Sequence, residues 1–428
     1  MTTATPAPSR VLVPDTSRYH VFRAGEEDKL RRYVQLCLDA PVFGIDTETT
    51  GFDVYGALDA GDRTVGYSIS HAPGVGVYVP FLHTHPTAGL YPGQMAYEDA
   101  LAILAPLILP EHASGRPPAV FHNYDFDARA IWKDYGYAPS PIEDTVLAAR
   151  VLSWGTGRWD PKSSGEGSSR SLKALTEELL GHEGIHYEED FDKKDPYELL
   201  NGRPRGDYAA ADASNTLGIR VKLLALLRQY GLESTWAVEC RLAPVVAGMH
   251  IQGVPVDYDF AESASARGDD LAERVKGAYL AALSERLGRD VDVSLNSPVQ
   301  LRELFFGEPP EGLGLPVLAR TAKGAPKLDK HVLNALAVEY PFVSAILEHR
   351  KVTKQVGTYL KGMPKHRNSS TDRVHARFNQ LSTATGRFSS SEPNMQNMTG
   401  RVTEVRVTDD EVWRVNIRDM VCAPEGYY

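Results

Sequence analysis

Two acidic side chains, Asp46 and Glu48, directly follow a short apolar run, Pro41-Val-Phe-Gly-Ile45. Such a run predicts a buried strand that carries both acids at its end. Residues two apart on a strand leave the same face, so the two carboxylates are expected to be neighbours. Neighbouring carboxylates repel each other, and a cation bound between them relieves the repulsion. Taken alone, the pair is more typical of solvated acids at a strand end.

Two further patterns carry polar groups at a spacing of four. Asn123 and Asp127 flank a predicted strand-to-helix turn, where either residue alone is most often a helix cap. Tyr208 and Asp212 lie one turn apart on one face of a predicted helix. The alanines between them leave room for a close approach, although an ordinary amphipathic helix has the same pattern.

The elements that must position these groups change character along the chain. Before about Gly231, strands and helices alternate, which predicts an α/β domain. After it, helical patterns dominate, and strand-like sequence returns only at 374–381. The expected strands are 41–48, 65–70, 75–81 and 119–122, and the expected helices are 97–109, 126–135, 143–152, 171–180, 208–230, 234–250, 261–287, 299–305, 330–339 and 342–360.

In chain order the patterns D-x-E, N-x-x-x-D and Y-x-x-x-D supply four acids and one phenol. This order resembles the three exonuclease motifs of the DEDD superfamily, in its tyrosine-containing branch, and the flanks Phe43–Thr49 and Ser171–His182 extend the resemblance. It implies a ribonuclease H-like α/β fold and a 3′–5′ exonuclease that releases nucleoside monophosphates from single-stranded 3′ ends. The implied residues are Asp46, Glu48, Asp127 and Asp212 as catalytic metal ligands, Tyr208 as a further catalytic residue, and Thr49, Phe52 and Asn123 as DNA contacts.

Four carboxylates suit hard Mg²⁺ or Mn²⁺, because these cations prefer oxygen ligands. Two such ions about 3.5–4 Å apart can activate a water and stabilise the departing 3′ oxygen. Tyr208 is expected to orient the water, since a phenol with a pKa of about 10 is a poor base at neutral pH.

The chain from Arg241 onward resembles the front of a family A DNA polymerase. The resemblance rests on Leu242–Asp257, Leu295–Leu301, Ile346–Leu360 and above all Val374–Asn397, which contains Thr383-Ala-Thr-Gly-Arg-Phe-Ser-Ser and Pro393-Asn-Met-Gln-Asn. It implies thumb helices and the beginning of a palm that bind primer–template duplex. Arg350 and Lys354 are expected at phosphates, and the donors of Arg387, Asn394 and Gln396 at the minor-groove acceptors that every base pair presents.

Several features depart from the family pattern. His250 stands where the family usually has Glu, and Val356 replaces a thumb lysine, which puts one phosphate contact in doubt. No 5′-nuclease domain precedes the exonuclease, which favours a phage-like member. The sequence stops before the catalytic aspartates of the palm. We therefore expect no polymerisation by this chain alone, and a C-terminal polymerase half from a second chain, a split gene, an intein junction or missing sequence.

The composition limits the classes of protein to which the chain can belong. The 428 residues are 42% hydrophobic and 24% charged, as in globular proteins, and the net charge is −10. Residues 344–387 nevertheless hold nine basic and two acidic side chains, a local excess of +7 that alone is typical of a solvated helix face. The three cysteines favour a reducing compartment, and no apolar run is long enough for a membrane span.

We therefore predict a leader at 1–21, an exonuclease domain at 22–231 and a partial, mainly helical polymerase domain at 232–428. Cytoplasmic location, DNA as partner and a processivity factor as a further partner are expected from the resemblance. A catalytically weak DNA-binding scaffold is the alternative function, and an RNA-processing exonuclease is a weaker one that the motif at 383–390 argues against. His83 and His85 lack a third metal ligand and are expected on the surface.

Overall fold

The computed structural model describes residues 19–51, 61–85, 89–112, 114–156, 170–182, 206–383, 385–406 and 412–423. These form two compact units, one of residues up to Gln252 together with Arg377–Ser390, the other of Gly253–Ala376 and the residues from Ser391 on. No helix in these ranges is long and apolar enough to cross a membrane. The α/β class of the first unit and the helical character of the second confirm the predicted fold class.

The first unit is built on a mixed sheet of six strands in the order β1-β4-β3-β2-β7-β8. Strands β2, β3 and β4 pair antiparallel, and β7 and β8 extend the sheet in parallel beside β2. The strands are β1 (Tyr19–Val21), β2 (Phe43–Thr49), β3 (Thr64–Ser70), β4 (Gly76–Pro80), β7 (Ala119–Phe121) and β8 (Ile142–Asp144). The hairpin predicted from residues 65–81 is confirmed as β3 and β4.

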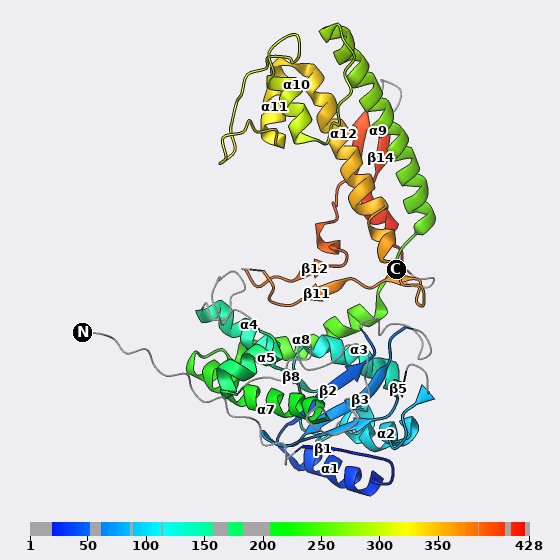
Figure 1. The fold of residues 1–428 in the computed structure, drawn as a ribbon, viewed down its shortest axis with the longest axis vertical. Coiled ribbons are helices and arrows are strands. Elements are labelled where there is room, and N and C mark those ends of the chain that lie inside the picture. The colour runs from blue at the N-terminus through cyan, green and yellow to red at the C-terminus, as the bar shows by residue number, and fades with distance from the viewer. Residues whose placement is uncertain are drawn as a thin grey trace, which may run out of the picture. The chain divides into compact units, whose positions relative to one another are not determined.

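The described α-helices of this unit are α1 (Glu27–Asp39), α2 (Tyr97–Leu104), α3 (Tyr124–Tyr135), α4 (Thr145–Thr156), α5 (Leu172–Leu175), α7 (Gly206–Gln229) and α8 (Glu233–Gln252). Figure 1 shows the sheet in blue, with the green helices α7 and α8 packed beside it. Apolar side chains from the strands, α1 and α3 fill one core between them, which includes Phe43, Ile45 and Ile131. The expected helices at 208–230 and 234–250 are confirmed.

Two glycines let α7 lie directly on the sheet. A Cβ on Gly44 or Gly76 would come within 3.0 Å of the backbone carbonyl oxygens of Ala213 and Ala210. The facing surface of α7 is lined with small buried side chains, among them Ala209 and Ala210. The alanines between Tyr208 and Asp212 therefore make room for the sheet itself.

The segment Arg377–Ser390 packs within the first unit. The Phe378 amide donates to His250 Nε2 at 2.6 Å, and the Arg150 guanidinium donates to the Gln380 carbonyl at 2.6 Å. The Gln380 side chain in turn donates to Glu239 Oε2 at 2.7 Å. This compact unit thus differs from the predicted sequence domain, whose boundary at residue 231 stays a prediction.

The second unit is organised along one long helix, α9 (Tyr258–Leu287). One core joins α9 to α12 (Ser344–Lys354), its π-helical continuation (Gln355–Leu360) and the hairpin of β13 (Thr403–Arg406) and β14 (Val412–Val415). A second core joins the far end of α9 to α10 (Pro298–Phe306) and α11 (Lys330–Glu339). Figure 1 shows α9 and α12 side by side, with α10 and α11 at one end.

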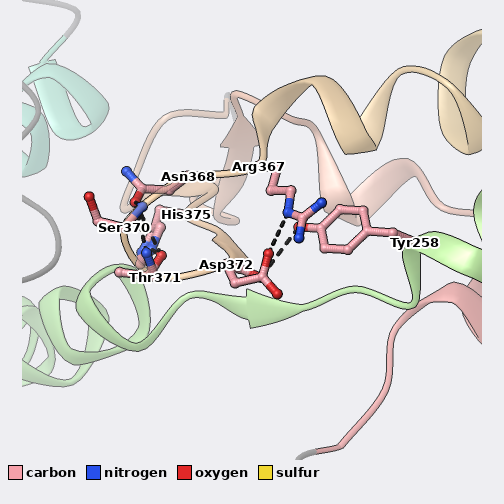
Figure 2. A network of polar contacts seen from close by, with 7 residues as sticks. All are labelled: Tyr258, Arg367, Asn368, Ser370, Thr371, Asp372 and His375. Carbon is pink, nitrogen blue, oxygen red and sulfur yellow. Dashed lines mark hydrogen bonds and ion pairs between the residues drawn. The ribbon is translucent and has the colours of Figure 1, made fainter.

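A polar turn precedes the strand β10 (Arg373–Val374), which pairs with β9 (Val254–Pro255). Figure 2 shows that Arg367 pairs with Asp372 and stacks over the ring of Tyr258, 4.2 Å from its centroid. The Asn368 side chain accepts hydrogen bonds from the amides of Ser370 and Thr371. These polar contacts hold the turn, and they engage Arg367, one of the nine basic residues of 344–387, within the chain.

The close approach of α7 to the sheet predicts a sharp difference between two glycine-to-alanine variants. Gly44→Ala should weaken the packing of α7 by about 1–3 kcal/mol, because its methyl group meets backbone. Gly248→Ala, in α8 with open space around its Cβ position, should stabilise the unit by about 0.5–1 kcal/mol. Native-state hydrogen exchange of the α7 and α8 amides measures both changes. An unweakened Gly44→Ala variant would contradict this packing.

Candidate active site

Three predicted carboxylates converge at one place. Asp46, Glu48 and Asp212 each offer an oxygen within 4.8 Å of the other two, and all three remain partly accessible to solvent. Asp46 and Glu48 leave β2 on one face, and α7 brings Asp212 to that face through its contact with Gly44. The arrangement is therefore a consequence of strand alternation and of the helix approach.

Asp127 lies beside this group and is held by Thr47. The Thr47 amide and hydroxyl donate to Asp127 Oδ1 at 2.9 and 2.7 Å. The start of α3 is itself anchored by the buried Asp144, which accepts from the Tyr124 amide at 2.8 Å. Asp127 thus approaches the other acids from a helix whose first turn is tied to β8.

Asn123 does not cap α3. It adopts the left-handed conformation (φ 74°), its side chain makes no capping hydrogen bond, and it is exposed. The capping interpretation is therefore wrong for this residue, because Asp144 performs that role. The Asn123 amide group remains on the surface at the same end of α3 as Asp127.

Tyr208 and Asp212 are hydrogen-bonded across one turn of α7, as their spacing predicted. The charge of Asp212, followed by burial, raises the pKa of the Tyr208 phenol far above its ordinary value. Lys173 of α5 lies over the Tyr208 ring, with Nζ 6.0 Å from the centroid, and its charge opposes the rise in the pKa of Asp212. The phenol therefore remains protonated and can act as a donor.

Burial and mutual repulsion make these acids hard to ionise together. Burial, then Asp212 and Asp127, raise the pKa of Glu48 to about 8. Burial raises the pKa of Asp212 to about 7, against the Tyr208 hydrogen bond and Lys173. Burial also raises the pKa of Asp127 to about 7, although the hydrogen bonds from Thr47 oppose it, and burial followed by Asp127 raises that of Asp46 well above its usual range.

This donor set fits a hard divalent cation. All candidate ligand atoms are carboxylate oxygens, and the repulsion that raises their pKa values disappears when a cation binds among them. Asp46, Glu48, Asp212 and Asp127 could hold Mg²⁺ or Mn²⁺. The predicted carboxylates thus come together, and their ligand role stays a prediction.

The other predicted contacts lie elsewhere or outside the described residues. Thr49 ends β2, and its hydroxyl donates to the Gly51 carbonyl at 2.7 Å. Phe52 lies outside the described residues. Arg387 is exposed in the segment that packs within the first unit. Asn394 and Gln396 are exposed in the second unit.

Arg350 and Lys354 differ in their surroundings. The Arg350 guanidinium donates to the carbonyls of Leu295 and Leu328 at 3.2 and 3.1 Å, and burial lowers its pKa. Lys354 is exposed and makes no ion pair or hydrogen bond with any residue that the structure describes. Val356, where the family has a lysine, is buried in the core against Gly268.

Sequence reasoning missed several residues that support the site. None of Thr47, Lys173 and Asp144 was singled out, although Thr47 and Lys173 lie in the stretches Phe43–Thr49 and Ser171–His182 that the resemblance includes. The surface assignment was wrong for His83, which is fully buried and hydrogen-bonded to the Tyr78 hydroxyl at 2.7 Å.

Two protein families match the chain in successive regions. The family described as 3′-5′ exonuclease matches residues 23–228, and the family described as DNA polymerase family A matches residues 266–428. The carboxylate site lies wholly within the first match, and α9 to β14 lie largely within the second.

Curated relatives and a solved structure agree with these matches. The chain is 30% identical to DNA polymerase I of Rhizobium leguminosarum over 396 residues, which is 88% of the chain and 36% of the relative. It is 30% identical to DNA polymerase I of Pseudomonas aeruginosa over 91% of the chain and 39% of the relative. The chain therefore spans well under half the length of these relatives. It is similar in fold to the POL domain of Pol1 from M. smegmatis in complex with DNA primer-template and dNTP (TM-score 0.67, 23% identity, 96% of this chain and 59% of that chain).

The raised pKa values predict how the metal-free protein responds to pH. Groups whose pKa is higher in the folded state stabilise it below their unfolded pKa, and this contribution is lost as pH rises through the folded pKa of about 7–8. We expect stability in EDTA to fall, on the order of several kcal/mol, between about pH 6.5 and 8.5. Buried His83 and His122, whose pKa values are lowered, act in the opposite direction, but only below about pH 6.5.

Urea unfolding of the first unit at a series of pH values measures this dependence. Asp46→Asn removes one of the repelling charges, so its stability relative to the parent chain should rise as pH increases. Saturating Mn²⁺ should make the free energy of unfolding of the parent chain nearly independent of pH, whereas that of Asp46→Asn should still change with pH. A metal-free parent profile that is flat or rises over this pH range would contradict the repulsion described above.

Proposed function

The chain belongs to the family A DNA polymerases and carries their 3′–5′ exonuclease domain, and from this premise we propose that its first unit removes nucleotides from single-stranded 3′ ends of DNA in a Mg²⁺-dependent reaction. The observation that carries the proposal is the convergence of Asp46, Glu48 and Asp212, with Asp127 beside them. The whole relatives are named DNA polymerase I, and proofreading during DNA replication is the process that this activity would serve.

The residues of the chain would have the following roles in the exonuclease reaction. Asp46, Glu48, Asp127 and Asp212 hold the cations, which when bound activate water and stabilise the leaving 3′ oxygen. The Tyr208 hydroxyl donates its one proton to Asp212, and we propose that its oxygen accepts a hydrogen bond from the attacking water and so orients it. Asn123, exposed at the start of α3, and Thr49, at the end of β2, contact the terminal nucleotides, and Phe52 is proposed to pack on the last base.

For the second unit we propose binding to primer–template duplex. Lys354 is exposed and without a partner among the described residues, so it supplies a phosphate contact. Asn394 and Gln396 supply donors for the minor groove, and Arg387, which belongs to the first unit, is proposed separately as a further donor. Arg350 acts indirectly, because its hydrogen bonds to the carbonyls of Leu295 and Leu328 tie α12, which carries Lys354, to the segments before α10 and α11.

Release of the 3′ nucleotide from labelled single-stranded DNA tests the first proposal. Asp46→Ala and chelator should both reduce release to background. Tyr208→Phe should lower kcat about 100-fold, as expected when one positioned hydrogen-bonding group is lost. Asp99→Ala, which removes an exposed carboxylate from the first turn of α2, is the matched control and should retain full activity. Equal background release from the parent chain and Asp46→Ala would reject the exonuclease and leave a DNA-binding scaffold.

Salt-dependent binding to a primer–template duplex tests the second proposal. Lys354→Ala should weaken binding and reduce the slope of log K against log salt by about one, because one phosphate contact is lost. Lys361→Ala removes a lysine of the same helical region that is already paired with Asp269 and should change the slope little. Arg350→Ala should instead lower the melting temperature of the second unit. Equal slopes for Lys354→Ala and Lys361→Ala would contradict the assignment of Lys354.

A further inference from the structure

A buried tyrosine–histidine pair lies behind the carboxylate site. Tyr78 on β4 and His83 just after it are both fully inaccessible to solvent, and the Tyr78 hydroxyl lies 2.7 Å from His83 Nε2. The backbone of His83 is fixed on both sides by Gln94, whose side chain accepts from its amide and donates to its carbonyl, each at 3.0 Å. The imidazole is therefore held in one place relative to the sheet.

The Tyr78 ring reaches across β3 toward Glu48. It occupies the space above Gly66, where a Cβ would collide with the phenol oxygen and with ring carbons. Gly66 is the direct cross-strand partner of Glu48, and such partners share a face, with their Cβ positions about 5 Å apart. The phenol oxygen thus lies on the same face of the sheet as the Glu48 side chain, and the two make no direct hydrogen bond in this structure.

Tyr78 also packs beneath α7. It forms a small buried cluster with Ala209 and Ala210, and Tyr208 packs against this cluster. The charges of Glu48 and Asp46, after burial, raise the pKa of Tyr78, which agrees with their proximity. The phenol is therefore neutral and retains a proton to donate.

The position of the proton on the His83 ring determines the direction of the Tyr78 hydroxyl proton. Burial lowers the pKa of His83 to about 4, so the ring is neutral and carries one N–H. Its Nδ1 is buried and has no hydrogen-bond partner in the described part of the chain. A buried donor without an acceptor is rarer than an acceptor without a donor, which favours the proton on Nε2. Nε2–H then donates to the phenol oxygen, and the Tyr78 hydroxyl must donate to another group.

We propose that Tyr78 is a positioning residue: when a cation is bound, its hydroxyl, oriented by His83, donates to the Glu48 carboxylate and turns the other Glu48 oxygen toward the cation. The inference rests on the proposed function, because it takes Glu48 as a metal ligand. A hydrogen bond of this kind fixes the rotamer of a ligand that would otherwise be free to turn, and loss of such supporting partners commonly weakens metal affinity by about 10–100-fold.

Titration calorimetry with Mn²⁺ in the absence of DNA tests the inference on the full chain. Tyr78→Phe keeps the ring above Gly66 and removes only the hydroxyl, so Mn²⁺ should bind about 10–100-fold more weakly. In the exonuclease assay the half-saturating Mn²⁺ concentration should rise by a similar factor, while the KM for single-stranded DNA at saturating Mn²⁺ stays within about twofold. Tyr97→Phe, which removes a phenol bonded to Asp134 at 3.0 Å, is the matched control and should bind Mn²⁺ normally.

A second pair of variants guards against misfolding. His83→Leu should weaken Mn²⁺ binding, and His83→Gln, which can restore a donor near the Nε2 position, should recover part of it. The double variant His83→Leu/Tyr78→Phe should bind Mn²⁺ no more weakly than Tyr78→Phe alone, because both substitutions act through the same Tyr78 hydroxyl. Normal Mn²⁺ affinity in Tyr78→Phe together with lost affinity in Glu48→Gln would overturn the inference and leave the exonuclease intact. A parent chain that neither binds Mn²⁺ nor degrades DNA would overturn both.

Discussion

The repulsion among carboxylates that packing holds together is the constraint on which the first unit depends. Asp46 and Glu48 are fixed by strand alternation, and Asp212 is brought to them because Gly44 and Gly76 let α7 lie directly on the sheet. At neutral pH this arrangement works against the metal-free fold, since burial raises the pKa of each acid and like charges add to the rise for Asp46 and Glu48. The cores around it must therefore supply the stability that the site removes, a distribution typical of functional sites.

Much of this organisation could be predicted from the sequence, because it depends on local pattern. Strand alternation at 46–48, the helical spacing of Tyr208 and Asp212 and the change to helices after the first unit are properties of short windows, and the order of three motifs linked them. The supporting contacts could not be predicted in this way. Thr47 meets Asp127 across 80 residues, and Lys173 reaches Tyr208 from a different helix, so their roles exist only in the folded chain. Asn123 carried the residue type of a cap, yet the cap is Asp144, 20 residues beyond Tyr124, whose amide it binds.

His250 shows how a departure from a family pattern can be explained by its partners. Its Nδ1 pairs with Asp125, and its Nε2 accepts the Phe378 amide of the segment 377–390. A neutral imidazole can donate to the carboxylate and accept from the amide at the same time, whereas a glutamate there would oppose Asp125 with a like charge. The exchange of Glu for His is therefore matched to the acid at 125. Burial favours the neutral form of Asp125, but the hydrogen bond from His250 and the charge of Arg129 outweigh it and keep the pKa of Asp125 below its usual range. Asp125 is therefore ionised, although Asp127, two residues away, resists ionisation.

The same electrostatics limit what Tyr208 can do. A phenol becomes a useful base only when its environment lowers its pKa, and here the charge of Asp212 raises it. Lys173 lies over the ring at 6.0 Å but acts mainly on Asp212, where it favours the ionised carboxylate that a cation requires. The two residues thus have complementary effects: Lys173 helps Asp212 to remain charged, and charged Asp212 keeps Tyr208 protonated. It follows that Tyr208, whose proton is donated to Asp212, can orient a water by accepting a hydrogen bond from it but cannot remove its proton, so the negative charge needed for attack must be stabilised by whatever cation the four carboxylates hold.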